Sequence, residues 1–187
     1  TTHIAMQVSG LPRERVMGMA GALDTARFRC FIGMELGCSA VDVQAMVLGG
    51  HGDSMVPLAS SATVGGVPIA QLIEPERLEE IIQRTRDGGA EIVGLLKQGS
   101  AFYAPSAGVT EMVASIVRNE GRVMPVSVLL KGEYGITDCF LGVPVKLGAG
   151  GVEEIIEVGL SDEEMAALQA SEGHVKETVA AWERLSA

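Results

Sequence analysis

The segment that decides the fold reads Val43-Gln-Ala-Met-Val-Leu-Gly-Gly-His-Gly-Asp-Ser-Met-Val-Pro57. It begins with a short apolar run, Val43–Leu48, whose length and β-branched residues predict a buried strand. Two glycines follow the run, so we expect a tight turn with His51 at its tip and little side-chain cover from Gly52. Because an imidazole titrates near neutral pH, a histidine presented in this way suits proton transfer. The alternative is a glycine-rich hairpin in which His51 has no chemical role.

A second segment, Gly18-Met-Ala-Gly-Ala-Leu-Asp-Thr-Ala-Arg-Phe28, predicts a strand that leads into a helix. The strand is expected over Arg15–Met19. On the helix that follows, Asp24 and Arg27 are three positions apart, so both side chains can lie on the same side of its first turn. Each residue also has a simpler interpretation. Asp24 is a common type of helix N-cap, and Arg27 alone is typical of a solvated surface charge.

Considered together, these motifs resemble the lactate/malate dehydrogenase family, and most closely its lactate-dehydrogenase-like malate dehydrogenases. The elements Asp-x-x-Arg, at Asp24 and Arg27, and His-Gly-Asp, beginning at His51, stand at the family's relative spacing. The resemblance continues through Arg84-Thr-Arg-Asp-Gly-Gly-Ala-Glu-Ile-Val93, Gly99-Ser-Ala-Phe-Tyr-Ala-Pro105, Glu133-Tyr-Gly135 and Gly142-Val-Pro-Val-Lys-Leu-Gly148. It therefore covers nearly the whole chain.

The resemblance implies a role for each of three residues. His51 looks like the acid/base that protonates the keto oxygen of oxaloacetate and removes the proton from the malate hydroxyl. Asp24 looks like its partner, since a neighbouring carboxylate raises the pKa of a histidine and fixes its tautomer. Arg27 looks like the group that binds the substrate carboxylate, because a planar guanidinium can grip a carboxylate with two parallel hydrogen bonds.

Three further positions follow from the resemblance only. Ala101 takes a place near the substrate, and Met19 and Pro105 take places near the nicotinamide ring of NAD. All three are apolar, so a purely structural role is the alternative for each of them. Hydride transfer itself belongs to the nicotinamide, and the protein supplies position and electrostatics.

By the same resemblance, residues 1–187 are the C-terminal catalytic and substrate-binding domain, and the family's N-terminal NAD-binding domain is missing from the chain. The sequence agrees, since it contains no G-x-G-x-x-G fingerprint. Its nearest approach, Gly148-Ala-Gly-Gly151, lacks the third glycine and precedes a strand-like run rather than a helix. We therefore expect the main NAD site in the missing domain and no activity from the isolated chain.

The composition narrows the class of protein. A formal charge of -10 argues against a nucleic-acid-binding surface. We expect no signal peptide, and the sequence contains no apolar run long enough to cross a membrane. The cysteines Cys30, Cys38 and Cys139 have no metal or redox spacing, so we expect reduced, mostly packed thiols in a cytoplasmic protein. We interpret His3 and His174 as surface or packing residues, and we expect no metal site.

Apolar periodicity predicts the remaining elements. A helix is expected over Leu78–Leu96, bent or broken at Gly88-Gly89, and a hairpin turn is expected within Val64–Pro68. A further helix should follow Gly99–Pro105, and its buried side should carry Val109, Met112, Val113, Ile116 and Val117. Runs bounded by glycines predict an antiparallel meander over Val123–Leu130, Phe140–Leu147 and Val152–Val158, with Glu133–Gly135 as a turn.

The last helix should begin at a capping box, Ser161-Asp-Glu-Glu164. Its apolar stripe is expected to consist of Met165, Leu168, Val175, Val179 and Trp182. The predicted fold class is α+β: three or four helices, one of them bent, against twisted and mostly antiparallel sheets.

Four functions are compatible with these features. The first is the catalytic half of an NAD-dependent malate dehydrogenase of the tricarboxylic acid cycle, which interconverts (S)-malate and oxaloacetate. The second is a dehydrogenase of another 2-hydroxyacid, such as lactate. By the resemblance, the residues that usually settle this choice, including a mobile loop and further arginines, lie in the missing part, while the wording of Gly49–Pro57 and of Ala104-Pro105 favours malate. A related NAD-dependent glycosidase is disfavoured because no cysteine neighbours His51 in the sequence. A non-catalytic association domain is disfavoured by the intact Asp24, Arg27 and His51. The family's proteins are homodimers or homotetramers, so we expect a homo-oligomer.

Overall fold

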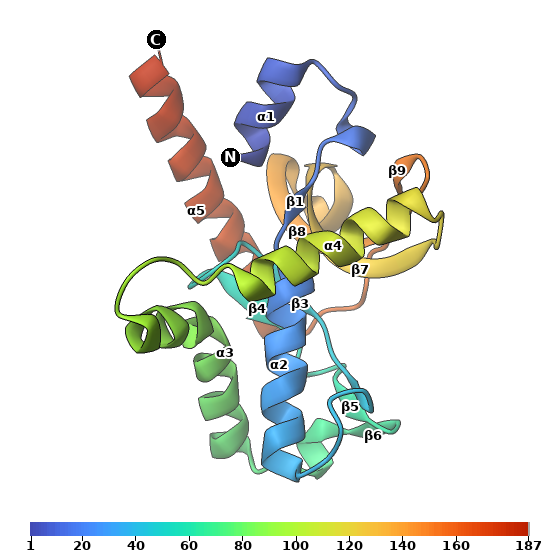
Figure 1. Ribbon diagram of the computed structural model, residues 1–187, viewed down its shortest axis with the longest axis vertical. Coiled ribbons are helices and arrows are strands. Elements are labelled where there is room, and N and C mark those ends of the chain that lie inside the picture. The colour runs from blue at the N-terminus through green and yellow to red at the C-terminus, as the bar shows by residue number, and fades with distance from the viewer. Residues whose placement is uncertain (187) are drawn as a thin grey trace.

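The computed structural model describes residues 1–186, which form one large and one small antiparallel sheet surrounded by helices (Figure 1). The α-helices are α1 (Thr2–Ser9), α2 (Gly21–Leu36), α3 (Pro75–Leu96), α4 (Tyr103–Val117) and α5 (Asp162–Ser186). The 3-10 turns are η1 (Arg13–Arg15), η2 (Ile69–Gln71) and η3 (Glu133–Gly135). The strands are β1 (Gly18–Met19), β2 (Val43–Gln44), β3 (Val47–Gly49), β4 (Met55–Pro57), β5 (Thr63–Val64), β6 (Val67–Pro68), β7 (Arg122–Lys131), β8 (Thr137–Gly148) and β9 (Gly151–Ile155).

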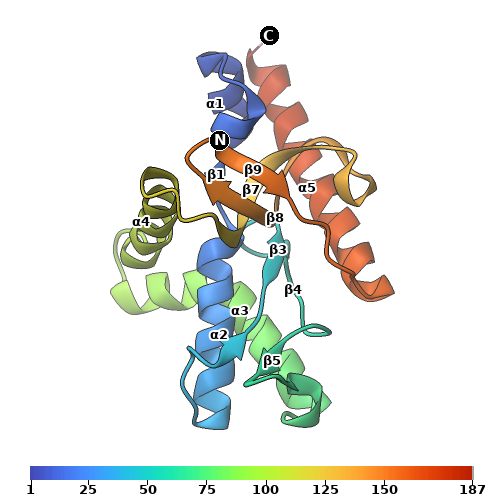
Figure 2. The same ribbon diagram turned by 90° about the vertical axis from the view of Figure 1, so that its right-hand side faces the viewer.

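The large sheet has the order β1-β7-β8-β3-β4, with β9 also paired to β8, and the small sheet has the order β2-β5-β6. Helices α4 and α5 lie on opposite sides of the large sheet (Figure 2). Helices α2 and α3 pack against each other and extend away from the large sheet towards the small one (Figure 1). The fold class predicted from the sequence is confirmed. Within residues 1–186 there are five α-helices rather than three or four, because the short α1 adds one.

Two main clusters of buried apolar residues hold these layers together. The larger cluster lies between the large sheet and the helices on its two sides, and its fully buried members include Val126, Leu141, Val143, Leu147 and Leu168. The second cluster lies between α2, α3 and the small sheet, and it includes Phe28, Ile32, Val43, Val47, Met55 and Ile69. Most members of both clusters are aliphatic. Burial of apolar area on this scale is the main favourable term in folding.

The predicted meander and hairpin are confirmed. Strands β7 and β8 are paired in antiparallel register over most of their length, and β9 continues the meander on the other edge of β8. The hairpin turn within Val64–Pro68 falls at Gly65 and Gly66, both of which have the positive φ that favours glycine.

Two strands differ from the sequence prediction. The apolar run Val43–Leu48 is not one strand: it is divided between β2, which belongs to the small sheet, and β3, which belongs to the large sheet. The strand expected over Arg15–Met19 is reduced to β1, because η1 occupies Arg13–Arg15. Apolar character predicts burial, and it does not indicate which sheet a residue joins.

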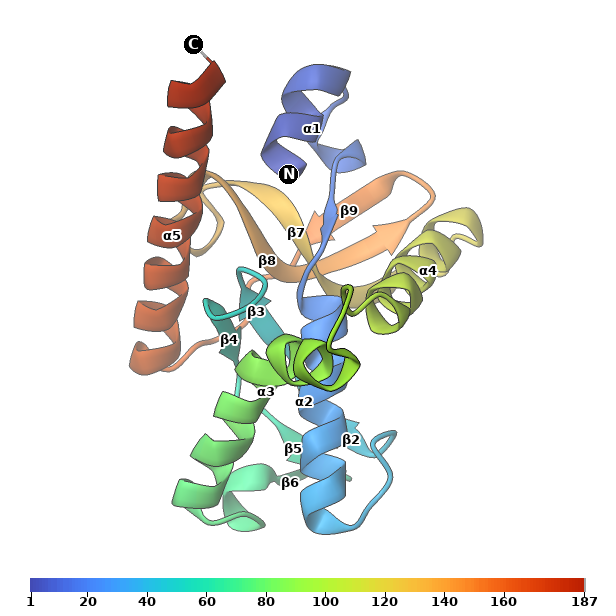
Figure 3. The same ribbon diagram turned by 60° about the vertical axis from the view of Figure 1, so that its left-hand side comes forward.

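Helices α3 and α4 differ from the prediction in what they bury. Helix α3 continues through Gly88-Gly89 without a break in its hydrogen bonding, and it changes direction along its length as expected (Figure 3). On α4, Met112 is buried as predicted, whereas Val109, Val113 and Val117 are 45%, 51% and 77% exposed. Nothing in residues 1–186 packs over that side of α4, so the apolar pattern marks a face that this chain leaves uncovered.

The capping box of α5 is confirmed. The Ser161 backbone N–H donates to the Glu164 carboxylate at 3.0 Å, and the Glu164 N–H donates to Ser161 Oγ at 3.2 Å. These two bonds satisfy donors that a helix start otherwise leaves unpaired. Leu168 of the predicted stripe is fully buried, and Met165 and Val175 pack beside it against the large sheet.

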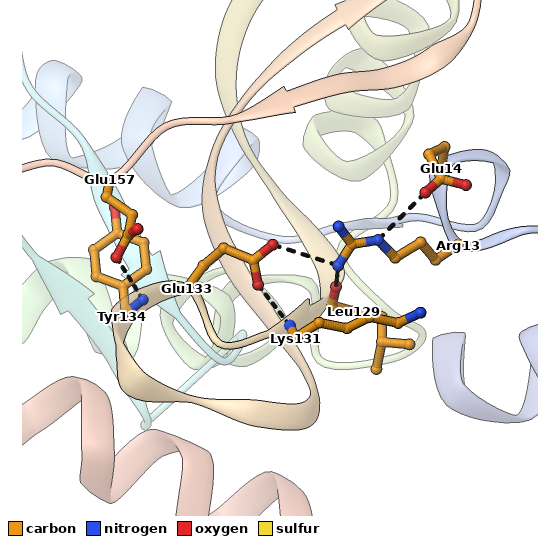
Figure 4. A network of polar contacts seen from close by, with 7 residues as sticks. All are labelled: Arg13, Glu14, Leu129, Lys131, Glu133, Tyr134 and Glu157. Carbon is orange, nitrogen blue, oxygen red and sulfur yellow. Dashed lines mark hydrogen bonds and ion pairs between the residues drawn. The ribbon is translucent and has the colours of Figure 1, made fainter.

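Figure 4 shows the polar network that closes the β7–β8 hairpin and ties the N-terminal part of the chain to it. Arg13 of η1 donates to the Leu129 carbonyl at 3.2 Å and to the Glu133 carboxylate at 3.3 Å. Within η3, Tyr134 has a positive φ of 56°, and its backbone N–H donates to the Glu157 carboxylate at 2.7 Å. The predicted turn at Glu133–Gly135 is confirmed, and side chains rather than glycine alone hold it.

The cysteines are free, but they are less packed than predicted. Cys139 is buried, and burial raises the pKa of its thiol to about 11. Cys38 is half-buried, and Cys30 is exposed on α2, which corrects the expectation of mostly packed thiols. The cytoplasmic location inferred from these thiols stays a prediction. None of the helices described is both long and apolar enough to cross a membrane.

Candidate active site

The histidine is presented by a hairpin of the large sheet. Strands β3 and β4 pair in antiparallel register, with Leu48 opposite Val56 and Gly49 opposite Met55. Between the strands, the chain makes a short loop closed by a hydrogen bond from the Met55 N–H to the Gly52 carbonyl at 3.0 Å. The buried strands fix both ends of this loop. His51 lies within it, with its side chain 45% exposed.

Asp24 lies beneath the loop, in the first turn of α2, and it is fully buried. The residue at the N-cap position is Ala20, so the interpretation of Asp24 as an N-cap is wrong. Its carboxylate instead accepts a hydrogen bond from His51 Nδ1 at 2.9 Å. Because a carboxylate can only accept, Nδ1 carries a proton and the neutral imidazole has its free lone pair on Nε2. Among residues 1–186, no hydrogen-bond partner of Nε2 is present.

The hydrogen bond that His51 donates to Asp24 raises the pKa of His51 above its ordinary value of 6.5. Partial burial of the ring and the positive charge of Arg27 act in the opposite direction and lower that pKa, while the negative charge of Asp24 raises it further. The net effect favours the imidazolium, which is the form that donates a proton.

Arg27 completes the group, one helical turn after Asp24. Its Nη1 donates to Asp24 Oδ1 at 3.3 Å, and its side chain is only 11% exposed. The Nε atom is buried and has no hydrogen-bond partner among the residues described. A buried guanidinium donor without a partner costs free energy unless an acceptor reaches it. The site is therefore suited to a ligand that carries a carboxylate.

Helix α3 makes room for this guanidinium through a glycine. A Cβ added to Gly88 would lie 3.1 Å from Arg27 Cδ and 3.5 Å from its Nε. That approach is tighter than ordinary side-chain contacts. The sequence predicts that the helix bends or breaks at Gly88-Gly89. The structure adds that Gly88 lies directly against the Arg27 side chain.

A hollow of about 380 Å³ opens beside the histidine, between α1, β1, the β3–β4 loop, β8 and α5. Its lining includes Met19, Ala20, Gly50, His51, Ser54 and His174. Met19, which the resemblance places near the nicotinamide ring, and His51, which it gives the acid/base role, thus line one cavity. No lysine or arginine of residues 1–186 lines it.

The other two predicted positions lie apart from this hollow. Ala101 is half-buried in the connection between α3 and α4, and Pro105 is half-buried in the first turn of α4. Neither lines the hollow that contains His51. Their predicted places near the substrate and the nicotinamide ring remain predictions.

A residue that the sequence does not mark joins the two elements that carry the site. Thr25 Oγ1, on α2, accepts a hydrogen bond from the Val47 N–H of β3 at 2.9 Å. The bond couples the helix that carries Asp24 to the strand that leads to His51. A threonine directly after Asp24 was the available signal, but the pattern of one sequence does not show which strand it meets.

Comparisons with known proteins show the family of the chain. The family described as lactate/malate dehydrogenase, alpha/beta C-terminal domain, matches residues 21–185. A malate dehydrogenase of Roseiflexus sp. (strain RS-1) is 55% identical over 180 residues, which are 96% of this chain and 58% of the relative. The chain thus spans 58% of the length of that relative.

Solved structures give the same result. The malate dehydrogenase of Salinibacter ruber superposes with a TM-score of 0.96 at 53% identity, over 99% of this chain and 60% of that protein. A lactate dehydrogenase of Cryptosporidium parvum, described as a complex with substrate (lactic acid) and cofactor (nicotinamide adenine dinucleotide), superposes with a TM-score of 0.90 at 41% identity. That match covers 92% of this chain and 56% of the other.

Proposed function

This chain belongs to the lactate/malate dehydrogenase family as its alpha/beta C-terminal domain, and from that premise we propose that it is the catalytic half of an NAD-dependent malate dehydrogenase. The observation that carries the proposal is the contact series from His51 Nδ1 to Asp24 Oδ2 at 2.9 Å and from Asp24 Oδ1 to Arg27 Nη1 at 3.3 Å. It supplies a proton-transfer group, the carboxylate that orients it, and a cation for an acidic substrate.

In malate oxidation, His51 Nε2 accepts the proton of the malate hydroxyl as the carbon–oxygen double bond of oxaloacetate forms. Asp24 keeps Nδ1–H in place and stabilises the positive charge that the imidazole gains. In the reverse direction, the imidazolium returns this proton to the keto oxygen. NAD, when bound, accepts or returns the hydride.

Arg27 binds the substrate carboxylate next to the reacting carbon. Its unpartnered Nε–H supplies one of the two parallel donors that a carboxylate accepts from a guanidinium. Asp24 contacts both the guanidinium of Arg27 and the imidazole of His51. It therefore fixes the position of the bound substrate relative to the imidazole. Orientation of this kind lowers the barrier of the chemical step.

The hollow fits the nicotinamide end of the cofactor, because Met19 and Ala20 give an apolar wall beside His51. It does not fit the diphosphate equally well, since no lysine or arginine among the described residues lines it. We therefore assign to this chain the wall near the reacting ring. The main NAD site is assigned to a separate nucleotide-binding domain, as expected from the family resemblance.

The exposed apolar face of α4 supports the assignment of the main NAD site to a separate domain. The stacked Phe102 and Tyr103 rings are 59% and 82% exposed, and Val109, Val113 and Val117 continue the exposed apolar surface along α4. Several large apolar side chains exposed along one helix indicate a contact with another protein surface. Because the relatives are longer than this chain, we assign the face to the nucleotide-binding domain. A homodimer or homotetramer remains a further proposal.

Lactate is the second candidate substrate, supported by the match to a lactate dehydrogenase at 41% identity. Malate is preferred because the proteins named malate dehydrogenase reach 53% and 55% identity. The His51, Asp24 and Arg27 group serves either 2-hydroxyacid.

The test is a chimera in which the part of the Salinibacter ruber enzyme that this chain does not cover is joined to this chain. NADH formation is followed with malate and with lactate. The proposal predicts a higher kcat/KM for malate. A higher value for lactate would favour the second candidate, and a folded chimera that binds NADH but oxidises neither acid would contradict both.

A further inference from the structure

The His51 loop is held from an element that lies far along the chain. Ser171, on α5, is only 1% exposed, and its Oγ accepts a hydrogen bond from the Gly50 N–H at 2.7 Å. Gly50 immediately precedes His51. Between Gly50 and Ser54, Ser171 is the one side chain from another described element that hydrogen-bonds the loop backbone.

The two glycines before His51 allow this contact. A Cβ on Gly49 would lie 3.0 Å from Ser171 Oγ and 2.9 Å from the Ser54 carbonyl oxygen. A Cβ on Gly50 would lie 3.3 Å from Ser171 Oγ and 2.4 Å from Ser54 Oγ. Side chains at these positions would crowd both Ser54 of the same hairpin and the Ser171 hydroxyl of α5. The Gly-Gly pair therefore permits close approach of a hydroxyl to the backbone as well as a tight turn.

A second buried polar residue of α5 holds the turn that follows the second strand of this hairpin, at Ser60. The Glu164 carboxylate accepts hydrogen bonds from the Ser60 N–H at 3.1 Å and from Ser60 Oγ at 2.7 Å. Glu164 is 9% exposed. Figure 3 shows α5 beside β3 and β4, and its residues contact both strands. One helix thus fixes the hairpin before and after the histidine.

We propose that Ser171 is a positioning residue for His51, whose hydrogen bond to Gly50 holds the imidazole in line with Asp24. The carboxylate end of the His51–Asp24 bond is immobilised by full burial on α2, whereas the imidazole end depends on the loop. The effect of the Ser171–Gly50 hydrogen bond on the position of the His51 ring does not depend on which reaction the protein catalyses. The catalytic meaning of this role rests on the malate dehydrogenase function proposed above.

The test is a histidine titration by NMR on this chain. The chain has three histidines, so the signal of His51 is assigned by the loss of one signal in His51→Asn. The titratable or charged groups around His51 are Asp24 and Arg27 on α2 and Asp53 on its own loop, together with three that line the same hollow: His174 on α5, His3 on α1 and the amino group of Thr1. Ser171→Ala changes none of these groups.

Ser171→Ala is expected to lower the pKa of His51 towards 6.5, because the loosened loop weakens the bond to Asp24. The matched control is Ser115→Ala. Ser115 is equally buried, and its hydroxyl bonds the Leu147 carbonyl at 2.8 Å and the Arg122 N–H at 3.3 Å. This control should leave the His51 titration unchanged. An unchanged pKa in Ser171→Ala, or an equal fall in both variants, would overturn the proposal.

If Ser171→Ala does not fold, hydrogen exchange in the unmodified chain tests the same contact. The Gly50 amide proton should be protected, and exchange as fast as that of an exposed loop amide would overturn the proposal.

In the chimera, Ser171→Ala should lower kcat about tenfold and change the KM for malate by less than about twofold. A raised KM with an unchanged kcat would contradict a role in positioning the proton-transfer group. If the chimera proves inactive, the function fails while the NMR result still decides the role of Ser171.

Discussion

His51 Nδ1 lies 2.9 Å from Asp24 Oδ2, and the two side chains differ sharply in exposure: 45% for the histidine and 1% for the aspartate. The acceptor is thus fixed within the protein while the imidazole reaches towards solvent. This difference in exposure suits proton transfer, because the ring can exchange a proton with a ligand while its hydrogen bond to the buried Asp24 fixes its orientation. The pH dependence of stability, the binding of the substrate and the binding of the cofactor can each be measured separately.

The pH dependence of stability follows from the raised pKa of His51. Since the folded state favours the protonated ring, the stabilisation by Asp24 is fully present below the unfolded-state pKa of about 6.5 and is lost as pH rises through the folded-state pKa. His51→Asn should therefore destabilise this chain more at about pH 6 than at about pH 9. Urea unfolding at the two pH values measures the difference. An equal loss at both, or a greater loss at the higher pH, would show that the pair does not favour the imidazolium.

Arg27→Lys should raise the KM of the chimera for malate by roughly 10- to 100-fold, since a hydrogen bond to a charged group contributes about 1.5–3 kcal/mol. A lysine keeps the charge but replaces two parallel donors with a point charge. It also removes the buried Nε–H that has no partner among the described residues. Steady-state kinetics checks this result, and an unchanged KM would contradict the carboxylate-binding role.

Gly88→Ala should raise the same KM by roughly tenfold, because a forced displacement by one methyl group costs about 1–3 kcal/mol. The added Cβ would meet Arg27 Cδ at 3.1 Å. The matched control is Gly94→Ala on the same helix, where an added Cβ meets nothing within 4 Å. Both alanines favour the helix over glycine by about 0.5–1 kcal/mol. Only Gly88→Ala should affect KM, and equal KM values for the two variants would show that Gly88 does not shape the Arg27 site.

This chain alone should bind NADH weakly or not at all, because its hollow offers a wall for the nicotinamide end and no lysine or arginine among the described residues for the diphosphate. Calorimetric titration of the isolated chain measures this affinity, and the chimera serves as the positive control. Micromolar binding by the isolated chain would show that the main nucleotide site has been assigned to the wrong part of the enzyme.

The sequence marked the three residues of the contact group, but not the residues that support them. Asp24, Arg27 and His51 are marked by local motifs, and the structure places them in contact. Thr25 and Ser171 are not marked, because each hydroxyl bonds the backbone of a strand or loop remote in the sequence. A single sequence shows that a side chain is polar, but it does not show which distant amide that side chain meets.

The same limit applies to the fold. The meander and the capping box were predictable because glycine-bounded apolar runs and Ser-x-x-Glu spacing act locally. The division of Val43–Leu48 between two sheets depends on long-range pairing, and the exposed side of α4 depends on what packs over it. Periodicity identifies an apolar face, but the rest of the structure decides whether that face is buried.

The most direct measurement is the turnover of malate by the chimera carrying His51→Asn. Asparagine retains a polar side chain but cannot exchange a proton near neutral pH, so kcat should fall by about 10²- to 10⁴-fold. The affinity for NADH, measured by calorimetry on the same protein, should be unchanged. A kcat close to that of the unmodified chimera would contradict the assignment of His51 as the group that moves the proton.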